Sequence, residues 1–184
     1  AHTSTASCSS VTGGRAKCTN YNLTNNSIDF EIDYNSFNIT LDNQDATTSG
    51  TTTLYMRYAN GVYLDSSYSK KMSTSSNPIT KPTRTGYTFG GYYTGTNGTG
   101  TQLINASGYI TSSFTNNRFS SNATLYAKWY VASATTNGVT TYYTTLKDAI
   151  NAASTTQSTT IILYNDVSEF ISNGRALYNT TIDL

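Results

Sequence analysis

Charged side chains are scarce in this sequence. Asp, Glu, Lys and Arg make up 11% of its 184 residues, against about 25% in an average globular protein, and the formal net charge is only +1. Binding to nucleic acid needs clustered Lys and Arg that neutralise phosphates, whereas the one adjacent basic pair here is Lys70 and Lys71. The composition therefore argues against a nucleic-acid partner.

Histidine and cysteine are also rare in the sequence, and long apolar runs are absent from it. His2 is the one histidine, and the sequence contains no G-x-S-x-G, H-E-x-x-H or G-x-x-x-x-G-K-[ST] motif. Only His2 could join the two cysteines at a zinc ion, which leaves the ligand set incomplete. No apolar run approaches the roughly 20 residues of a transmembrane helix. We therefore expect no catalytic residue, cofactor, metal or membrane-spanning segment, and so no enzyme.

Tyrosine, threonine, serine, asparagine and glycine take the place of the missing charges. Aromatic residues make up 12% of the chain, and 16 residues are Tyr. Disordered chains combine low hydrophobicity with high net charge and few aromatics, so this chain should fold. Because Tyr and the β-branched Thr favour strands, the composition predicts a mostly β (α+β) fold.

The first segment, residues 1–36, contains both cysteines. A three-residue hairpin loop at residues 12–14 would place Cys8 directly opposite Cys18, with Gly14 in the left-handed position. Opposed strand residues lie about 4.5–5.5 Å apart at Cα, within disulfide range. We therefore predict a Cys8–Cys18 disulfide and an oxidising compartment. Two reduced thiols are the alternative.

An acidic strand is predicted at the end of the same segment. Residues 28–34 read IDFEIDY, so that apolar side chains face one way and Asp29, Glu31 and Asp33 the other. Three carboxylates could contribute to a Ca²⁺ site, which takes about six to eight oxygen ligands. A solvent-facing side of a half-buried strand is the interpretation we favour.

Residues 37–130 form a second block with alternating strands and glycine-containing turns. Leu125, Ala127 and Trp129 alternate with Tyr126 and Lys128, and similar patterns occur at residues 37–42 and 54–58. Turn signals lie between these strands at residues 60–61, 90–91 and 97–98. The block is predicted to be a β domain.

Residues 131–184 differ from the rest of the chain. A helix is predicted at residues 145–153, because Leu146, Ala149, Ile150 and Ala153 have helical spacing and Thr145 precedes them as a helix cap. Strands are predicted at residues 160–164 and 180–184. Because the last strand runs to the end of the sequence, and because neither a signal peptide nor an initiator Met is present, we expect this chain to be part of a longer protein.

Two motifs in the second block are similar to those of a known family. Residues 82–94 read PTRTGYTFGGYYT and resemble its PT+xGYTFxGWYT core. Residues 123–129 read ATLYAKW and resemble its closing TLYAKW signature. The family is the Listeria–Bacteroides repeat, also called the internalin B-type B repeat. This sequence departs from the pattern at Tyr92, where Trp is usual, and in an insertion of residues 58–77.

The resemblance implies a small β-grasp-like domain on secreted or cell-wall-attached bacterial proteins, with a spacer or weakly adhesive role and no catalytic residues. The third block, residues 131–184, resembles the start of a right-handed parallel β-helix. There residues 143–153 would form the cap helix, and residues 160–163 and 181–184 the first rungs. Such a cap would cover the open end of the solenoid.

Together these features lead us to expect a secreted or cell-surface bacterial module that acts as a stalk, spacer or adhesin segment. One alternative is the N-terminal part of a carbohydrate-active β-helix enzyme, whose catalytic residues would lie downstream. Another is a module that binds a glycan or a protein of a host or neighbouring cell. The contact residues would then be Tyr63 and Tyr68 in the insertion, and Tyr93 beside the inward-facing Tyr92.

Overall fold

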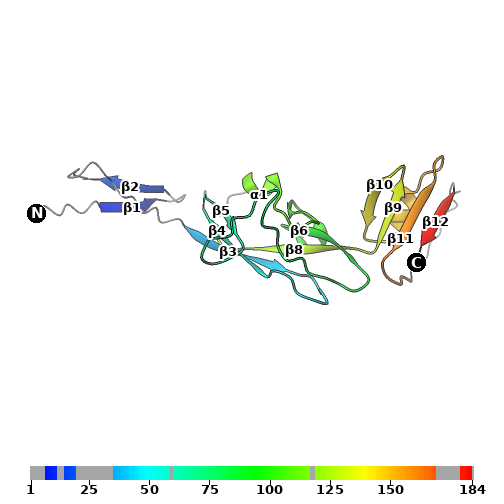
Figure 1. The fold of residues 1–184 in the computed structure, drawn as a ribbon, viewed down its shortest axis with the longest axis horizontal. Helices are drawn as coiled ribbons and strands as arrows, with labels where there is room; N and C mark the ends of the chain where they lie inside the picture. Colours follow the sequence, from blue (N-terminus) through cyan, green and yellow to red (C-terminus); the bar gives the residue numbers. More distant parts are fainter. Residues whose placement is uncertain are drawn as a thin grey trace, which may run out of the picture.

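The computed structural model describes residues 7–11, 15–19, 35–58, 60–116, 119–168 and 179–183. Strands dominate these residues, and the helices among them are few and short, which confirms the prediction of a mostly β fold. The strands form sheets of two, six and four members, which follow one another along the chain (Figure 1).

The two-stranded sheet is an antiparallel hairpin of β1 (Ser7–Val11) and β2 (Arg15–Thr19). Its register pairs Cys8 with Cys18, as the three-residue loop predicts. The predicted disulfide is nevertheless wrong, because no disulfide joins the cysteines in the described chain. Cross-strand pairing sets backbone positions only, whereas a disulfide also requires specific side-chain torsions. The cysteines therefore give no support to an oxidising compartment.

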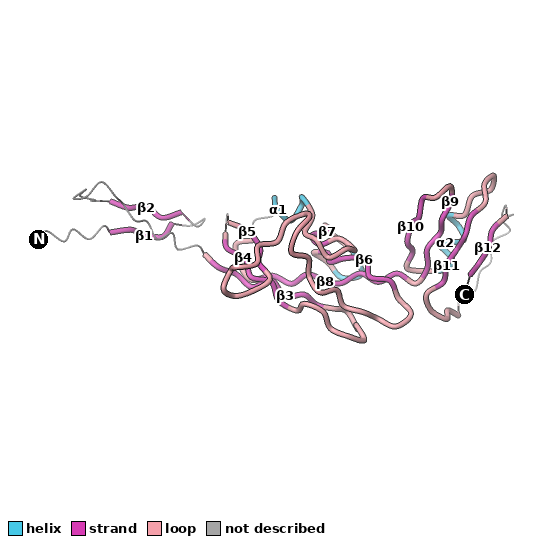
Figure 2. The backbone as a smooth tube through the Cα atoms, viewed as in Figure 1, coloured by secondary structure: helices cyan, strands magenta, loops and turns pink. Residues whose placement is uncertain are grey.

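The six-stranded sheet belongs to residues 35–130, the central module. Its strand order is β5 (Gly61–Tyr63), β4 (Thr53–Arg57), β3 (Ser36–Asp42), β8 (Ala123–Tyr130), β6 (Thr88–Tyr93) and β7 (Gln102–Ile104). The pair β3–β8 is parallel and the other pairs are antiparallel. The first and last strands of the module therefore lie side by side at its centre (Figure 2).

One face of this sheet carries the core. Along β8 the predicted alternation is confirmed, since Leu125, Ala127 and Trp129 are buried and the residues between them are partly exposed. The short helix α1 (Ser112–Asn116) contributes Phe114 to the same core, and the connection from β5 to β6 contributes Met72. Helix α1 and the connection from β5 to β6 thus cover the face of the sheet that carries the apolar side chains.

The four-stranded sheet belongs to residues 131–183, the C-terminal module. Its order is β10 (Val139–Tyr143), β9 (Ala132–Thr136), β11 (Thr159–Leu163) and β12 (Thr180–Asp183), with only β11–β12 parallel. The predicted helix is α2 (Leu146–Ala152), whose cap Thr145 accepts a hydrogen bond from the Asp148 N–H at 3.1 Å. Ala149 and Ile150 on α2 pack against the sheet.

A single residue, Val131, separates β8 of the central module from β9 of the C-terminal module. The Val131 N–H donates to the Tyr143 carbonyl at 3.0 Å, and the Val131 carbonyl accepts from the Tyr164 N–H at 2.8 Å. Tyr87 packs against the buried clusters of both modules. The two modules therefore lie end to end without a linker (Figure 1).

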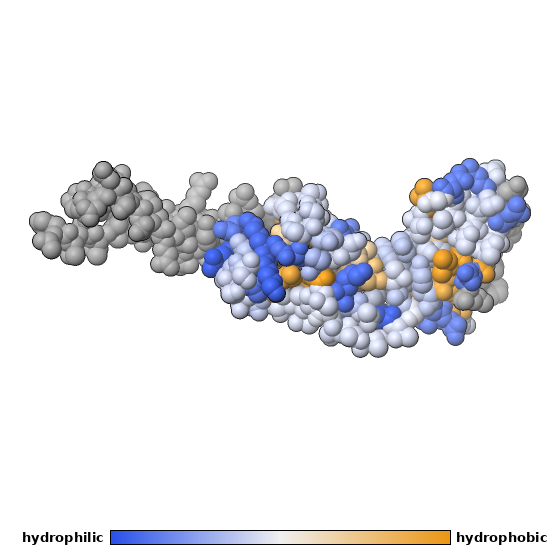
Figure 3. Space-filling view, viewed as in Figure 1, coloured by the Kyte–Doolittle hydropathy of each residue, from blue (hydrophilic) through white to orange (hydrophobic). Residues whose placement is uncertain are grey.

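The surface is mainly polar. The face seen in Figure 3 is mostly hydrophilic or intermediate, with small hydrophobic patches. Large exposed hydrophobic side chains among the described residues lie in the C-terminal module, at Val139, Tyr142, Ile162 and Ile182. In the part of the chain that the structure describes, no helix has the length and apolarity needed to cross a membrane.

Candidate functional site

A pocket of about 340 Å³ lies at the junction of the two modules. Its walls come from the β3–β4 loop, the turn before β6, the 3-10 helix η1 (Thr96–Gly98), the end of β8 and the residues before α2. Arg84, Tyr87, Asn97, Trp129 and Thr144 are among its lining residues. Because both modules supply walls, the pocket exists only while the junction holds them together.

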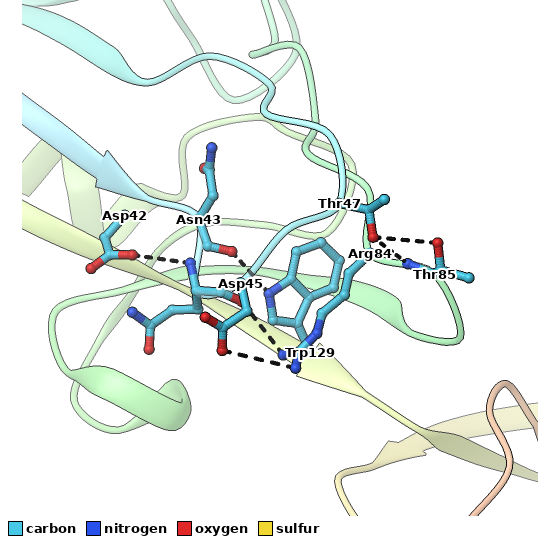
Figure 4. A network of polar contacts seen from close by, with 8 residues as sticks. Asp42, Asn43, Asp45, Thr47, Arg84, Thr85 and Trp129 are labelled. Carbon is cyan, nitrogen blue, oxygen red and sulfur yellow. Dashed lines mark hydrogen bonds and ion pairs between the residues drawn. The ribbon is translucent and has the colours of Figure 1, made fainter.

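Arg84 is the main charged group of the pocket. Its Cζ lies 4.1 Å from the centre of the Tyr87 ring, its Nη1 donates to the Gln44 carbonyl at 3.4 Å, and its Nη2 lies 3.9 Å from Asp45 Oδ2 (Figure 4). Charge-assisted hydrogen bonds are about 2.7–2.9 Å long when they are tight. Both polar contacts of the guanidinium are longer than this. Its N–H groups can therefore still donate hydrogen bonds to a ligand.

The turn that presents Arg84 and Tyr87 is held by the β3–β4 loop. The Tyr87 N–H donates to the Arg84 carbonyl at 3.0 Å, and Gly86 has φ of +74°, as the third position of a type II turn requires. The Thr85 N–H donates to Thr47 Oγ1 at 3.0 Å (Figure 4). The turn is therefore fixed within itself and against the loop.

Trp129 is one of the residues that line the pocket and is only 8% exposed. Its indole Nε1 donates to the Asn43 carbonyl (Figure 4), and the Tyr92 hydroxyl donates to the Asn43 side-chain oxygen. Burial, and secondarily the Asp42 carboxylate, raises the pKa of Tyr92 far above its ordinary value. The Tyr92 hydroxyl therefore keeps its proton, and can donate to Asn43, at alkaline pH where a free tyrosine would ionise.

A tyrosine cluster lies on the outward face of the central sheet and reaches across the junction. The Lys128 Nζ lies 5.1 Å from the Tyr130 ring centre and 5.6 Å from that of Tyr93, and the Tyr130 and Tyr142 ring centres are 5.6 Å apart. Burial, followed by the neighbouring Tyr93, raises the pKa of Tyr130 to about 12. The cluster thus presents aromatic surface from both modules, with Tyr142 43% exposed.

The three tyrosines predicted as ligand contacts do not form one surface. Tyr93 is partly exposed within the tyrosine cluster on β6. Tyr63 on β5 is only 6% exposed, and its hydroxyl donates to Asn60. Tyr68 is partly exposed and packs edge-on against Tyr63, with Arg57 over its ring at 3.7 Å. Strands β4, β3 and β8 separate β5 from β6, so Tyr93 lies apart from the other two.

The pocket contains polar and aromatic groups that could contact a ligand. No three His, Cys, Asp or Glu side chains gather into a metal site among the described residues. Asp29, Glu31 and Asp33, considered for Ca²⁺, lie outside those residues, as does His2. The pocket brings together a guanidinium, an ammonium, amides, hydroxyls and aromatic rings, which are groups that orient a ligand.

Arg84, Asn97 and Thr144 were not identified as site residues from the sequence. Arg84 lies inside the PTRTGYTF motif and Asn97 inside a turn signal, but neither pattern indicates a ligand. The three residues are far apart along the chain and meet only because of the strand order and the module junction. No pattern of neighbouring residues in the sequence indicates that these three side chains come together.

The chain was also compared with known proteins. No family model, curated protein or solved structure matches it. The resemblance to the Listeria–Bacteroides repeat therefore remains a prediction that rests on the two motifs.

Proposed function

We propose that this chain is a non-catalytic extracellular module that serves as a stalk, spacer or adhesin segment of a larger bacterial surface protein. The observation that carries the proposal is the junction, where Val131 alone joins β8 to β9 and Tyr87 packs into both cores. Modules on flexible Gly/Ser-rich linkers reorient freely. Modules joined in this way instead hold their outer ends at a set distance and orientation.

The strand order supports the family assignment that underlies this proposal. Five consecutive neighbours in the sheet are β4-β3-β8-β6-β7, and the first and last strands of the module form the central parallel pair. This order supports the proposal of a β-grasp variant. The family implies little helix, and the central module has the short helix α1 and the single turn η1. We therefore take the central module as a β-grasp variant of the Listeria–Bacteroides type, with β5 as an added edge strand.

The parallel pairing of β11 with β12 favours a second candidate function. In that interpretation residues 131–184 are the start of a β-helix, α2 is its cap, and the longer protein is a carbohydrate-active enzyme. Parallel neighbours are what successive coils of such a solenoid require. Polysaccharide cleavage by the longer parent protein would favour this candidate over the stalk.

Surface exposure is the first test of the proposal. An antibody against this chain should label intact cells of its source organism, and brief treatment of those cells with an external protease should remove the signal. Labelling that appears only after the cells are permeabilised would overturn the surface assignment.

Rigidity is the second test. Small-angle X-ray scattering should give one narrow distribution of interatomic distances for this chain. A variant with a flexible Gly-Ser linker inserted between Tyr130 and Val131 should give a broader distribution. If the two distributions coincide, the junction does not act as a rigid connection, and the spacer mechanism fails.

A further inference from the structure

We propose that the junction pocket is a binding site for a carboxylated sugar, such as a uronic acid unit of a glycan. This inference goes beyond the spacer role and does not depend on it. A carboxylated sugar combines an apolar ring face, a rim of hydroxyls and one anionic group. The pocket contains a counterpart for each of these three features.

The size and place of the pocket suit one sugar unit. Its volume of about 340 Å³ is at the lower end of the roughly 300–1,000 Å³ that is usual for small-molecule sites. Such sites often lie where two domains meet, and this pocket has walls from both modules. It therefore fits a terminal or single sugar residue better than a long glycan.

Tyr87 and Trp129 provide the aromatic part of the pocket lining, and Tyr87 is the more exposed of the two. Trp129 is held by its hydrogen bond to the Asn43 carbonyl and by edge contact with Phe89, whose ring centre is 5.6 Å away. Tyr87 is partly exposed and packs against both cores. Because neither ring has to be ordered when a ligand arrives, contact with a sugar face carries little entropic cost.

Amide and hydroxyl groups form the polar rim. Asn97 is exposed, and its backbone has φ of 56°, in the left-handed region that asparagine tolerates. Thr144 and Thr145 lie on the opposite module. The Thr145 oxygen accepts from the Asp148 N–H, which leaves its own O–H to donate. These groups supply both donors and acceptors, as sugar hydroxyls require.

The charges of the pocket favour an anionic ligand. Arg84 and the acid Asp45 line it, and Lys128 lines it too, although the Lys128 ammonium lies beside the Tyr93 and Tyr130 rings. The Asp45 side chain is 88% exposed and lies 3.9 Å from the guanidinium, so water screens this pair. The planar guanidinium fork matches a carboxylate in two parallel hydrogen bonds. Arg84 is therefore the group that would select a carboxylated sugar over a neutral one.

Isothermal titration of the full chain tests the site, with D-glucuronate as the probe and D-glucose and acetate as comparisons. We expect glucuronate to bind at least about tenfold more tightly than either comparison, since hydrogen bonds to charged groups contribute that much. Equal affinity for glucose would exclude carboxylate recognition, and equal affinity for acetate would exclude sugar recognition. Either result, or no binding of glucuronate at millimolar concentration, overturns the proposal.

Two variants locate the site. Arg84→Gln should weaken glucuronate binding about tenfold or more and leave glucose binding unchanged. Asn97→Asp should also weaken glucuronate binding, because it adds a negative charge to the rim. Asn137→Asp is the matched control, because Asn137 has the same left-handed backbone, with φ of 51°, on the exposed turn between β9 and β10. Equal losses in Asn97→Asp and Asn137→Asp would place the ligand outside the pocket.

Discussion

The indole Nε1 of Trp129 donates a hydrogen bond to the backbone carbonyl of Asn43 at 3.1 Å, across 86 positions of sequence. The bond ties the end of β8 to the loop that follows its parallel neighbour β3. The side chain of the same Asn43 accepts the Tyr92 hydroxyl. One asparagine thus fixes an aromatic residue from each of the two motifs in the central module.

Trp129→Phe should lower the free energy of unfolding by about 2–4 kcal/mol, because it removes buried ring volume and leaves the Asn43 carbonyl without its partner. Urea unfolding followed by circular dichroism measures the change. Tyr126→Phe is the control, since Tyr126 lies on the outward face of the same strand, and it should change the free energy by less than about 0.5 kcal/mol. If Trp129→Phe lowered the free energy of unfolding no more than Tyr126→Phe does, the Trp129 hydrogen bond would not stabilise the module.

Tyr87→Ala should uncouple the two modules, because Tyr87 is, among the described residues, the side chain that packs against both buried clusters. Differential scanning calorimetry should then resolve two unfolding transitions where the unaltered chain shows one. Tyr55→Ala, on the outward face of β4, should leave a single transition. A single, merely shifted transition in Tyr87→Ala would mean that the backbone connection at Val131 is sufficient for coupling.

Gly86→Ala should destabilise the chain more than Gly138→Ala does. Both glycines have positive φ, of +74° and +76°, so each substitution carries a backbone cost of about 1 kcal/mol. A Cβ on Gly138 meets nothing within 4 Å, whereas a Cβ on Gly86 would lie 2.6 Å from Cγ of Asn165. The excess cost should be about 1 kcal/mol by denaturant unfolding. It should shrink in the double variant with Asn165→Gly, which also removes the Asn165 Cβ at 2.8 Å, and an unchanged excess would argue against the contact.

Alkaline pH should destabilise the chain through Tyr130. Its pKa rises from 10 to about 12 on folding, so the folded state retains a proton that the unfolded state loses. The stability that this difference contributes is complete below pH 10 and is lost as the pH rises through 12. The melting temperature should therefore fall over this range, and less steeply in Tyr130→Phe. Identical slopes in the two proteins would contradict the raised pKa.

The local structure could be predicted because its signals are local. Alternation along β8 distinguishes Leu125, Ala127 and Trp129 from their outward neighbours. The helix predicted at residues 145–153 is observed at 146–152, with Thr145 as its cap. The loop length between β1 and β2 similarly predicts that Cys8 lies opposite Cys18. Each of these features depends on residues that are close in sequence.

The pocket and the strand order could not be predicted in this way. Pairing of β3 with β8 joins residues more than eighty positions apart, and alternation says which face is buried but not which strand is the neighbour. Arg84 and Thr144 meet at one pocket only after both sheets have formed and Val131 has joined them. The disulfide prediction was wrong because it treated strand register as sufficient for a bond that also depends on side-chain torsions.

The parallel pairing of β3 with β8 has a consequence under tensile force. The chain enters the central module at the start of β3 and leaves it at the end of β8, which lie at opposite ends of the pair. A pull between these points slides the two strands past each other along their axes. The bonds between residues 39–42 and 123–126 then bear the load together, whereas those of a hairpin pulled open break one by one. The centre of the module is thus arranged as a mechanical clamp loaded in shear.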